Sequence, residues 1–167
     1  EYGVGVNYYS QFRMQPGRRT NYDSVGAITS TADTPSPRDF REGFLTGNVA
    51  FPLFDGRLSA NAQVDGNRFH SLNAFYFLDA VQAPLRDEIG NFTEHNDGYE
   101  LGLNWDREAG PYSISVIGLV NRNTYDSFET FTSLAPSGAL NARTTQDLES
   151  KTGETILRGT IARGFGD

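Results

Sequence analysis

Two adjacent arginines with a tyrosine and an aspartate nearby form the best candidate binding cluster in this chain. Arg18, Arg19, Tyr22 and Asp23 lie within one polar segment. Guanidinium groups donate charge-assisted hydrogen bonds to anions, and a neighbouring aromatic ring can stack on a solute. The cluster therefore predicts a ligand-binding site for an anionic or sugar-like solute. The alternative is solvated charge in a polar loop.

Catalytic residues are not expected. The chain has two histidines, His70 and His95, and no cysteine. No serine stands in the Gly-x-Ser-x-Gly pattern that exposes a nucleophile at a strained turn. Asp87 and Glu88 are a conceivable carboxylate pair for glycoside hydrolysis, but they lie in a strongly polar segment. We expect no enzyme activity, and a β-rich hydrolase is the weakest of the alternatives.

Metal and cofactor sites are not expected either. Oxygen-bearing side chains gather between residues 87 and 97, but their spacing does not follow the Asp-x-Asp-x-Asp-Gly pattern of a calcium loop. The glycines of Gly3-Val4-Gly5 lie in an alternating strand pattern and do not open a helix, as a phosphate-binding loop requires. The sequence therefore predicts neither a metal nor a cofactor.

Composition narrows the class of protein further. The net charge of −7 argues against a nucleic-acid partner, because phosphate binding needs a basic surface. No apolar stretch approaches the ~20 residues of a membrane helix. The absence of cysteine excludes a disulfide scaffold. Any contact with a membrane must therefore be made by strands.

Strands with a two-residue period must position these side chains. Residues 2–14 alternate between apolar and small or polar types, and Tyr99 to Asp106 repeat the pattern. Leu45 to Leu53 and Leu58 to Val64 form two more such runs. Asp55-Gly56 between them is a strong hairpin signal. These patterns predict an all-β, antiparallel up-and-down meander.

Turn lengths differ between the two ends of the predicted strands. Short turns are expected at 55–56, 108–110 and 166–167, and long polar loops at 16–40, 79–97 and 130–152. This arrangement gives about six strands within one segment, residues 1–167. Short turns on one rim and long loops on the other are typical of a transmembrane β-barrel.

The segment around Gly66 allows two interpretations. Asp65-Gly66-Asn67 could form a tight turn between two short strands. Alternatively, Gly66 is a bulge within one strand running from 57 to 78. We favour the continuous strand because it keeps every long loop on the same rim.

Alternation alone does not tell which face meets lipid, water or a protein core. Small and amide side chains share one face, as a polar barrel lumen permits: Gly3, Gly5, Asn7, Asn48, Asn61, Gln63 and Asn104. Aromatic residues gather at strand ends, where interface girdles lie: Tyr2, Phe54, Trp105 and Tyr112. Arg68, His70 and Arg122 oppose this assignment because they fall on the otherwise apolar face. In a barrel they must lie outside the bilayer.

Two segments resemble barrel strands of TonB-dependent outer-membrane receptors. They are Tyr8-Tyr9-Ser10-Gln11-Phe12-Arg13-Met14-Gln15-Pro16-Gly17-Arg18-Arg19-Thr20 and Glu154-Thr155-Ile156-Leu157-Arg158-Gly159-Thr160-Ile161-Ala162-Arg163-Gly164-Phe165-Gly166-Asp167. The resemblance implies a 22-stranded barrel around an N-terminal plug, which takes up scarce nutrients at the bacterial outer membrane. The sequence has no segment that resembles the plug, and both of its ends are expected to be cuts in a longer polypeptide.

The sequence therefore predicts part of a transmembrane β-barrel, a fragment of an outer-membrane receptor or transporter wall that helps to bind and admit a nutrient. Its expected partners are outer-membrane lipid, a small nutrient ligand, and the remaining barrel strands and plug of the parent protein. The isolated fragment is expected to self-associate through its open edges. The alternative is a soluble secreted β-sandwich or small β-barrel that binds carbohydrate or another small ligand.

Overall fold

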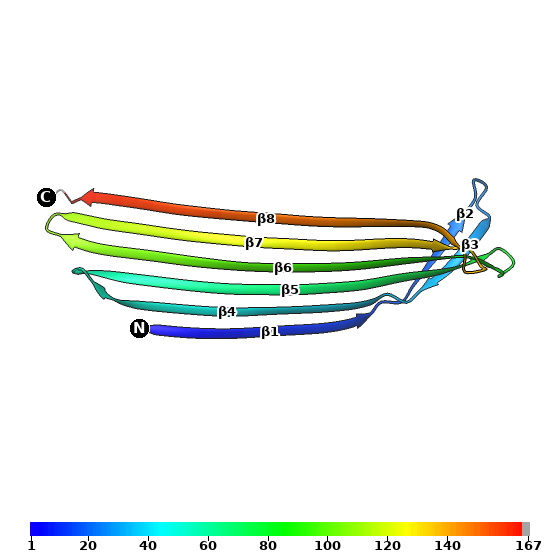
Figure 1. Cartoon of the computed structure of the whole chain (residues 1–167), viewed down its shortest axis with the longest axis horizontal. Helices are drawn as coiled ribbons and strands as arrows, with labels where there is room; N and C mark the ends of the chain where they lie inside the picture. Colours follow the sequence, from blue (N-terminus) through cyan, green and yellow to red (C-terminus); the bar gives the residue numbers. More distant parts are fainter. Residues whose placement is uncertain (165–167) are drawn as a thin grey trace.

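The computed structural model of the chain describes residues 1–164, and within them it contains only β-strands and turns (Figure 1). The strands are β1 (Tyr2–Met14), β2 (Gly17–Tyr22), β3 (Ile28–Thr34), β4 (Pro37–Leu53), β5 (Gly56–Asp79), β6 (Pro84–Ala109), β7 (Tyr112–Leu134) and β8 (Leu140–Arg163). No helix in this range is long and apolar enough to cross a membrane. The predicted all-β antiparallel class is confirmed.

The strands form one sheet with a simple order. β1, β4, β5, β6, β7 and β8 lie side by side and pair antiparallel, as Figure 1 shows. β2 and β3 form a hairpin inserted between β1 and β4, and β3 pairs with the part of β5 that extends beyond β4. The predicted count of about six strands is therefore wrong. Six strands make up the main order, and the inserted hairpin brings the total to eight.

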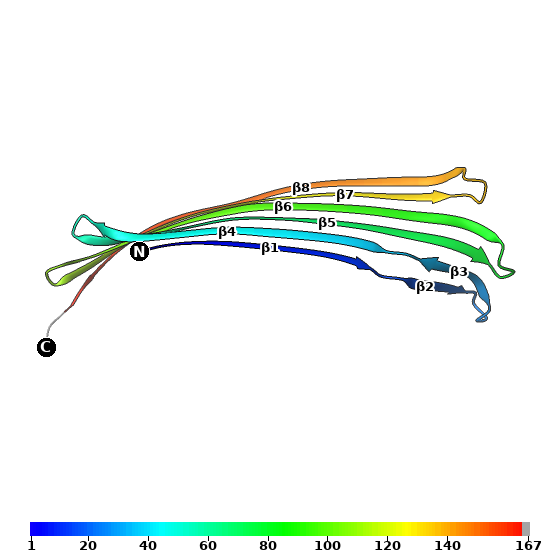
Figure 2. The ribbon, with the colours of Figure 1, turned by 90° about the horizontal axis from the view of Figure 1, so that it is seen from below.

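The sheet is a single layer with open edges. Figure 2 shows the strands in one gently curved layer with no second sheet against either face. β1 and β8 do not pair with each other, so the sheet does not close on itself. Among the described residues, the buried apolar side chains are only Ala32, Ala74 and Phe77. This sheet therefore has almost no hydrophobic core of its own.

The long loops expected at 16–40, 79–97 and 130–152 are wrong. β2, β3 and the start of β4 occupy the first segment, β6 begins at Pro84 in the second, and β8 begins at Leu140 in the third. These segments are rich in polar side chains, and the ladder between strands still satisfies their backbone hydrogen bonds. A polar composition in these segments therefore does not indicate irregular structure.

Tight turns connect the strands at both ends of the sheet. At the far end the turns span residues 23–27, 79–83 and 135–139, and each is closed by a backbone hydrogen bond of 2.8–2.9 Å between its first amide and its last carbonyl. At the near end, Phe54 and Asp55 form a two-residue turn with positive φ angles, and Gly110 and Pro111 form another. The predicted turn at 166–167 lies outside the described residues.

β5 is continuous through Gly66, which confirms the favoured continuous strand but not the bulge expected within it. Gly66 pairs with Gly43 on one side and with Asp97 on the other. The register does not shift there, so the proposed bulge is absent. A Cβ atom at this position would lie 2.7 Å from Oδ1 of Asp97, so glycine leaves room for a neighbouring side chain.

Candidate functional site

The predicted arginine cluster is divided between the two faces of the sheet. Arg18 and Arg19 are consecutive residues of β2, so their side chains point in opposite directions. Nε of Arg18 lies 3.1 Å from a carboxylate oxygen of Asp33. The guanidinium carbon of Arg19 lies 5.7 Å from the centre of the Phe77 ring. The two guanidinium groups therefore do not share one ligand.

Tyr22 and Asp23 do not contact the side chains of Arg18 or Arg19 in any hydrogen bond or ion pair that the structure shows among residues 1–164. The side chain of Tyr22 is exposed at the end of β2. Oδ1 of Asp23 accepts hydrogen bonds from the backbone amides of Val25 and Ala27, at 3.0 and 2.9 Å. This carboxylate thus stabilises its own turn. The four predicted residues are near in sequence without converging in space, and a ligand site there stays a prediction.

The best-packed part of the described sheet lies beside this hairpin. Phe77 is 1% exposed, and the guanidinium carbon of Arg86 lies 4.1 Å from the centre of its ring. Ala32 of β3 pairs with Phe77 and is equally buried. Nε of Arg86 also contacts a carboxylate oxygen of Glu88 at 2.7 Å. These contacts attach the β2–β3 hairpin to β5 and β6, which is a structural role.

The largest feature of the sheet is an apolar band across one face of its near half. We call this face the band face. The register places the alternate apolar residues of the main strands side by side: Val4, Val6, Leu45, Val49, Phe51, Leu58, Ala60, Ala62, Val64, Tyr99, Leu101, Leu103, Trp105, Ile114, Val116, Val120, Leu157 and Ile161. Many remain open to solvent, with Val4 77%, Leu103 52% and Leu157 82% exposed. A continuous apolar surface of this kind marks an interaction site.

The band can be measured along the strands that form it. Aromatic residues lie at its limits on β6. On β4 it runs from Leu45 to Leu53, and on β7 from Tyr112 to Val120, nine residues each. On β6, Trp105 marks the near limit and Tyr99 the far one. The indole Nε1 of Trp105 donates a 2.8 Å hydrogen bond to the carbonyl of Leu53. Aromatic rings thus lie at both limits of the band on β6, whereas Tyr2 pairs with Val49 inside the band.

The opposite face of the near half, which we call the polar face, carries the predicted small and amide residues. Gly3 pairs with Asn48, Asn48 with Asn61, and Asn61 with Gly102, so all four share this face. The amide side chain of Asn61 covers Gly102, and a Cβ there would overlap it. Small and amide side chains thus gather on this face at β1, β4, β5 and β6, whereas β7 and β8 place Ile117, Leu119 and Ile156 on it.

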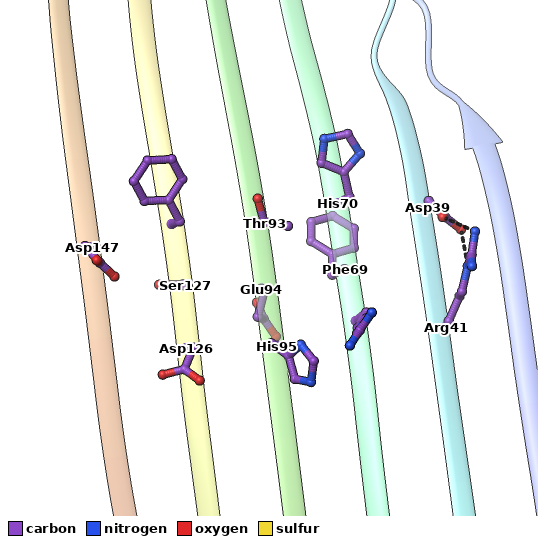
Figure 3. A pocket seen from close by; sticks show the side chains of 12 residues that line it. Asp39, Arg41, Phe69, His70, Thr93, Glu94, His95, Asp126, Ser127 and Asp147 are labelled. Carbon is purple, nitrogen blue, oxygen red and sulfur yellow. Dashed lines mark hydrogen bonds and ion pairs between the residues drawn. The ribbon is translucent and has the colours of Figure 1, made fainter.

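A groove lies on the band face immediately beyond the apolar band (Figure 3). Its volume is about 470 Å³, and residues from β4 to β8 line it: Asp39, Arg41, Arg68, Phe69, His70, Thr93, Glu94, His95, Asp126, Ser127, Phe128 and Asp147. Arg68 and His70, whose position in the sequence opposed a membrane face, are thus outside the band. Arg122 pairs with Tyr99 at the far limit of the band.

Basic residues occupy one end of the groove. Arg41 pairs with Arg68 across β4 and β5, and Arg68 pairs with His95 on β6. Asp39 binds Nη2 of Arg41 at 2.9 Å, and this hydrogen bond and the nearby negative charge raise the pKa of Arg41. Nε2 of His95 lies 2.8 Å from a carboxylate oxygen of Asp97. The acidic residues Asp126 and Asp147 line the other end.

Sequence reasoning missed this groove because its residues come from five strands. The available signal was the presence of Arg68 and His70 on an otherwise apolar strand face. The described residues contain no group of three or more His, Cys, Asp or Glu side chains that could hold a metal ion. Asp87 and Glu88 are consecutive on β6 and therefore face opposite sides of the sheet.

Comparisons with known proteins add no family assignment. No model of a known protein family matches the chain, and no curated protein sequence matches it.

Proposed function

We propose that this chain forms part of the wall of an outer-membrane receptor or transporter barrel, with the apolar band against lipid. The observation that carries the proposal is the band itself: apolar residues alternate along nine-residue stretches of β4 and β7, and many are open to solvent. Aromatic residues stand at its limits on β6 and β7, namely Tyr99, Trp105 and Tyr112. A tilted strand crosses a bilayer with about 9–11 residues. Aromatic girdles at both limits are typical of outer-membrane barrels.

The polar face supports the same proposal. In a membrane barrel the apolar side chains point outward and the lumen is polar. The face opposite the band carries glycine and amide side chains on β1, β4, β5 and β6. A soluble sandwich would instead bury its apolar face against a second sheet. All eight described strands belong to one sheet, so the described residues contain no second sheet that would cover the band.

The open edges imply further strands. Every backbone polar group within a bilayer needs a hydrogen-bond partner, so a sheet can cross only as a closed barrel. β1 and β8 each leave one edge unpaired in the described sheet. We propose that strands of the parent protein continue the sheet at these edges. The far halves of β5 to β8 would then project beyond the bilayer and contribute to binding the nutrient, as the resemblance to TonB-dependent receptors implies.

Light scattering with and without detergent tests the proposal. We expect aggregation in plain buffer, because the apolar band and both edges are exposed, and a defined species in detergent. A monodisperse monomer in plain buffer would contradict a membrane role and would favour a soluble protein.

A further inference from the structure

Three basic side chains form a row across neighbouring strands on the band face. Arg41 on β4, Arg68 on β5 and His95 on β6 are in direct register. Cross-strand neighbours on one face have Cβ atoms about 4.5–5.5 Å apart, and like charges directly opposite each other destabilise a sheet. Arg41 and Arg68 are therefore like-charged cross-strand neighbours. Asp39 offsets the charge of Arg41, and a bound anion would offset that of Arg68.

Arg68 is the member of this row without a protein partner. Arg41 is bound to Asp39, and His95 lies against Asp97. Within residues 1–164, the guanidinium of Arg68 has no hydrogen bond and no ion pair. It lies between the two other basic groups with its donors free. A guanidinium of this kind binds a phosphate through two parallel hydrogen bonds.

The position of the row relative to the band indicates where such a phosphate comes from. Arg68 is four residues beyond Val64, the last apolar residue of the band on β5. Four residues advance a strand by about 13 Å, which a 40° tilt reduces to about 10 Å along the bilayer normal. The headgroup region of each leaflet begins where the hydrocarbon ends and is about 5–8 Å thick. The Cα of Arg68 therefore lies about 2–5 Å outside the headgroup layer when the band meets hydrocarbon, a gap that the long side chain of an arginine can span.

The two ends of the groove differ in charge, and an anion is attracted to only one of them. Arg41, Arg68 and His95 line the part formed by β4 to β6, and Asp126 and Asp147 line the part formed by β7 and β8. The part formed by β4 to β6 also has two acidic residues: Asp39 is bound to Arg41, and Glu94 precedes His95 on β6, so its side chain points to the other face. The acidic end repels a phosphate. The basic end continues directly into the apolar band along β5. In a lipid, an anionic phosphate is likewise followed by an apolar chain, so the phosphate would meet the basic residues and the chain would meet the band.

We infer that the basic end of the groove binds the phosphate of a lipid headgroup, with Arg68 as its main donor and Arg41 and His95 beside it. This inference rests on the proposed function, because it requires the band to contact lipid chains. A free inorganic phosphate shares the anionic chemistry but lacks the chain, so it should bind far more weakly.

Native mass spectrometry of the chain in neutral-detergent micelles tests the inference. Phosphatidylglycerol, phosphatidylcholine and inorganic phosphate are the probes. We expect phosphatidylglycerol to bind best, and Arg68→Gln to weaken its binding about tenfold, since a charge-assisted hydrogen bond is lost. Arg68→Lys should retain more of the binding than Arg68→Gln. Arg57→Gln, which removes an exposed arginine on the polar face, is the matched control and should bind as the unaltered chain does.

Two results would overturn the inference while leaving the proposed function intact. One is equal binding of phosphatidylglycerol to the chain and to Arg68→Gln, with both proteins defined species in detergent. The other is displacement of the lipid by inorganic phosphate at the same concentration, which would indicate a site for free anions. Failure to enter micelles at all would instead count against the proposed function, and hence also against this inference.

Discussion

Val64 and Arg68 lie on the same face of β5, four residues or two strand periods apart, and this face changes from apolar to charged between them. Val64 belongs to a row of apolar and aromatic side chains that includes Val6, Leu45 and Tyr99. Arg68 belongs to the row with Arg41 and His95. One face of one strand thus carries an apolar surface and then a charged one. This boundary is what a strand that leaves a bilayer requires.

A charge placed within the band should be far more costly than the same charge on the opposite face. Ala62→Arg puts a guanidinium in the middle of the band, and we expect it to lower the free energy of unfolding in lipid by about 2–4 kcal/mol. Gln63→Arg, at the next residue, points to the polar face and is the control. Urea titration in lipid vesicles, followed by circular dichroism, measures both. Equal effects of the two variants would argue against a lipid-facing band.

Gly56 should tolerate no side chain. A Cβ at this position would overlap the carbonyl oxygen of Asp106 and lie 2.8 Å from Nε1 of Trp105. A backbone atom cannot move aside as the end of a side chain can, so Gly56→Ala should cost about 1–3 kcal/mol. Gly159→Ala is the matched control, because no atom lies within 4 Å of its added Cβ. It should be neutral or stabilising by up to about 1 kcal/mol. Equal effects in denaturant titrations would contradict this account.

Gln82 occupies a turn position that favours glycine. Its φ angle is 65°, and the equivalent residues of the other two far-end turns are Gly26 and Gly138, with φ angles of 85° and 80°. Gln82→Gly should therefore stabilise the sheet by up to about 1 kcal/mol, because the left-handed backbone costs a non-glycine residue about that much. Gly138→Ala should have the opposite sign. Melting temperatures of both variants check the prediction, and a loss on Gln82→Gly would refute it.

Phe77 should hold the β2–β3 hairpin against the sheet. Phe77→Ala removes the ring that packs between Arg19 and Arg86, at a cost of about 3–5 kcal/mol for a buried phenylalanine. The hairpin should then detach locally, and trypsin should cleave after Arg18 and Arg19 faster than in the unaltered chain. Tyr22→Ala removes an exposed ring from the same hairpin and should leave cleavage unchanged. Similar cleavage rates in both variants would show that Phe77 does not anchor the hairpin.

The sequence predicted the near half of the sheet well, for a physical reason. Residues 2–14 and 99–106 have one apolar and one polar face, so their alternation reveals both strand and sidedness. Residues 140–152 meet water on both faces, and the hydrophobic pattern vanishes although the strand continues. The backbone ladder with β7 stabilises that segment, and such pairing leaves no mark in the composition.

The candidate sites show the same limit. Arg18 and Arg19 were grouped because they are adjacent in sequence, yet adjacency within a strand places side chains on opposite faces. Arg41, Arg68 and His95 are far apart in sequence and become neighbours only through the register of β4, β5 and β6. Sequence spacing identifies the residues on one face of one strand. A site that crosses several strands depends on the register between them, which cannot be read from spacing along the chain.

A spin-label scan along β5 tests the central claim most directly. The chain has no cysteine, so single cysteines can be introduced from 57 to 70 without a prior substitution. In lipid bilayers, the account predicts that labels at 58, 60, 62 and 64 collide mainly with oxygen dissolved in lipid. Labels at 59, 61 and 63 should collide mainly with a water-soluble nickel complex, as should those at 68 and 70. Equal access of the nickel complex to both faces between 58 and 64 would contradict the claim that the apolar band faces lipid.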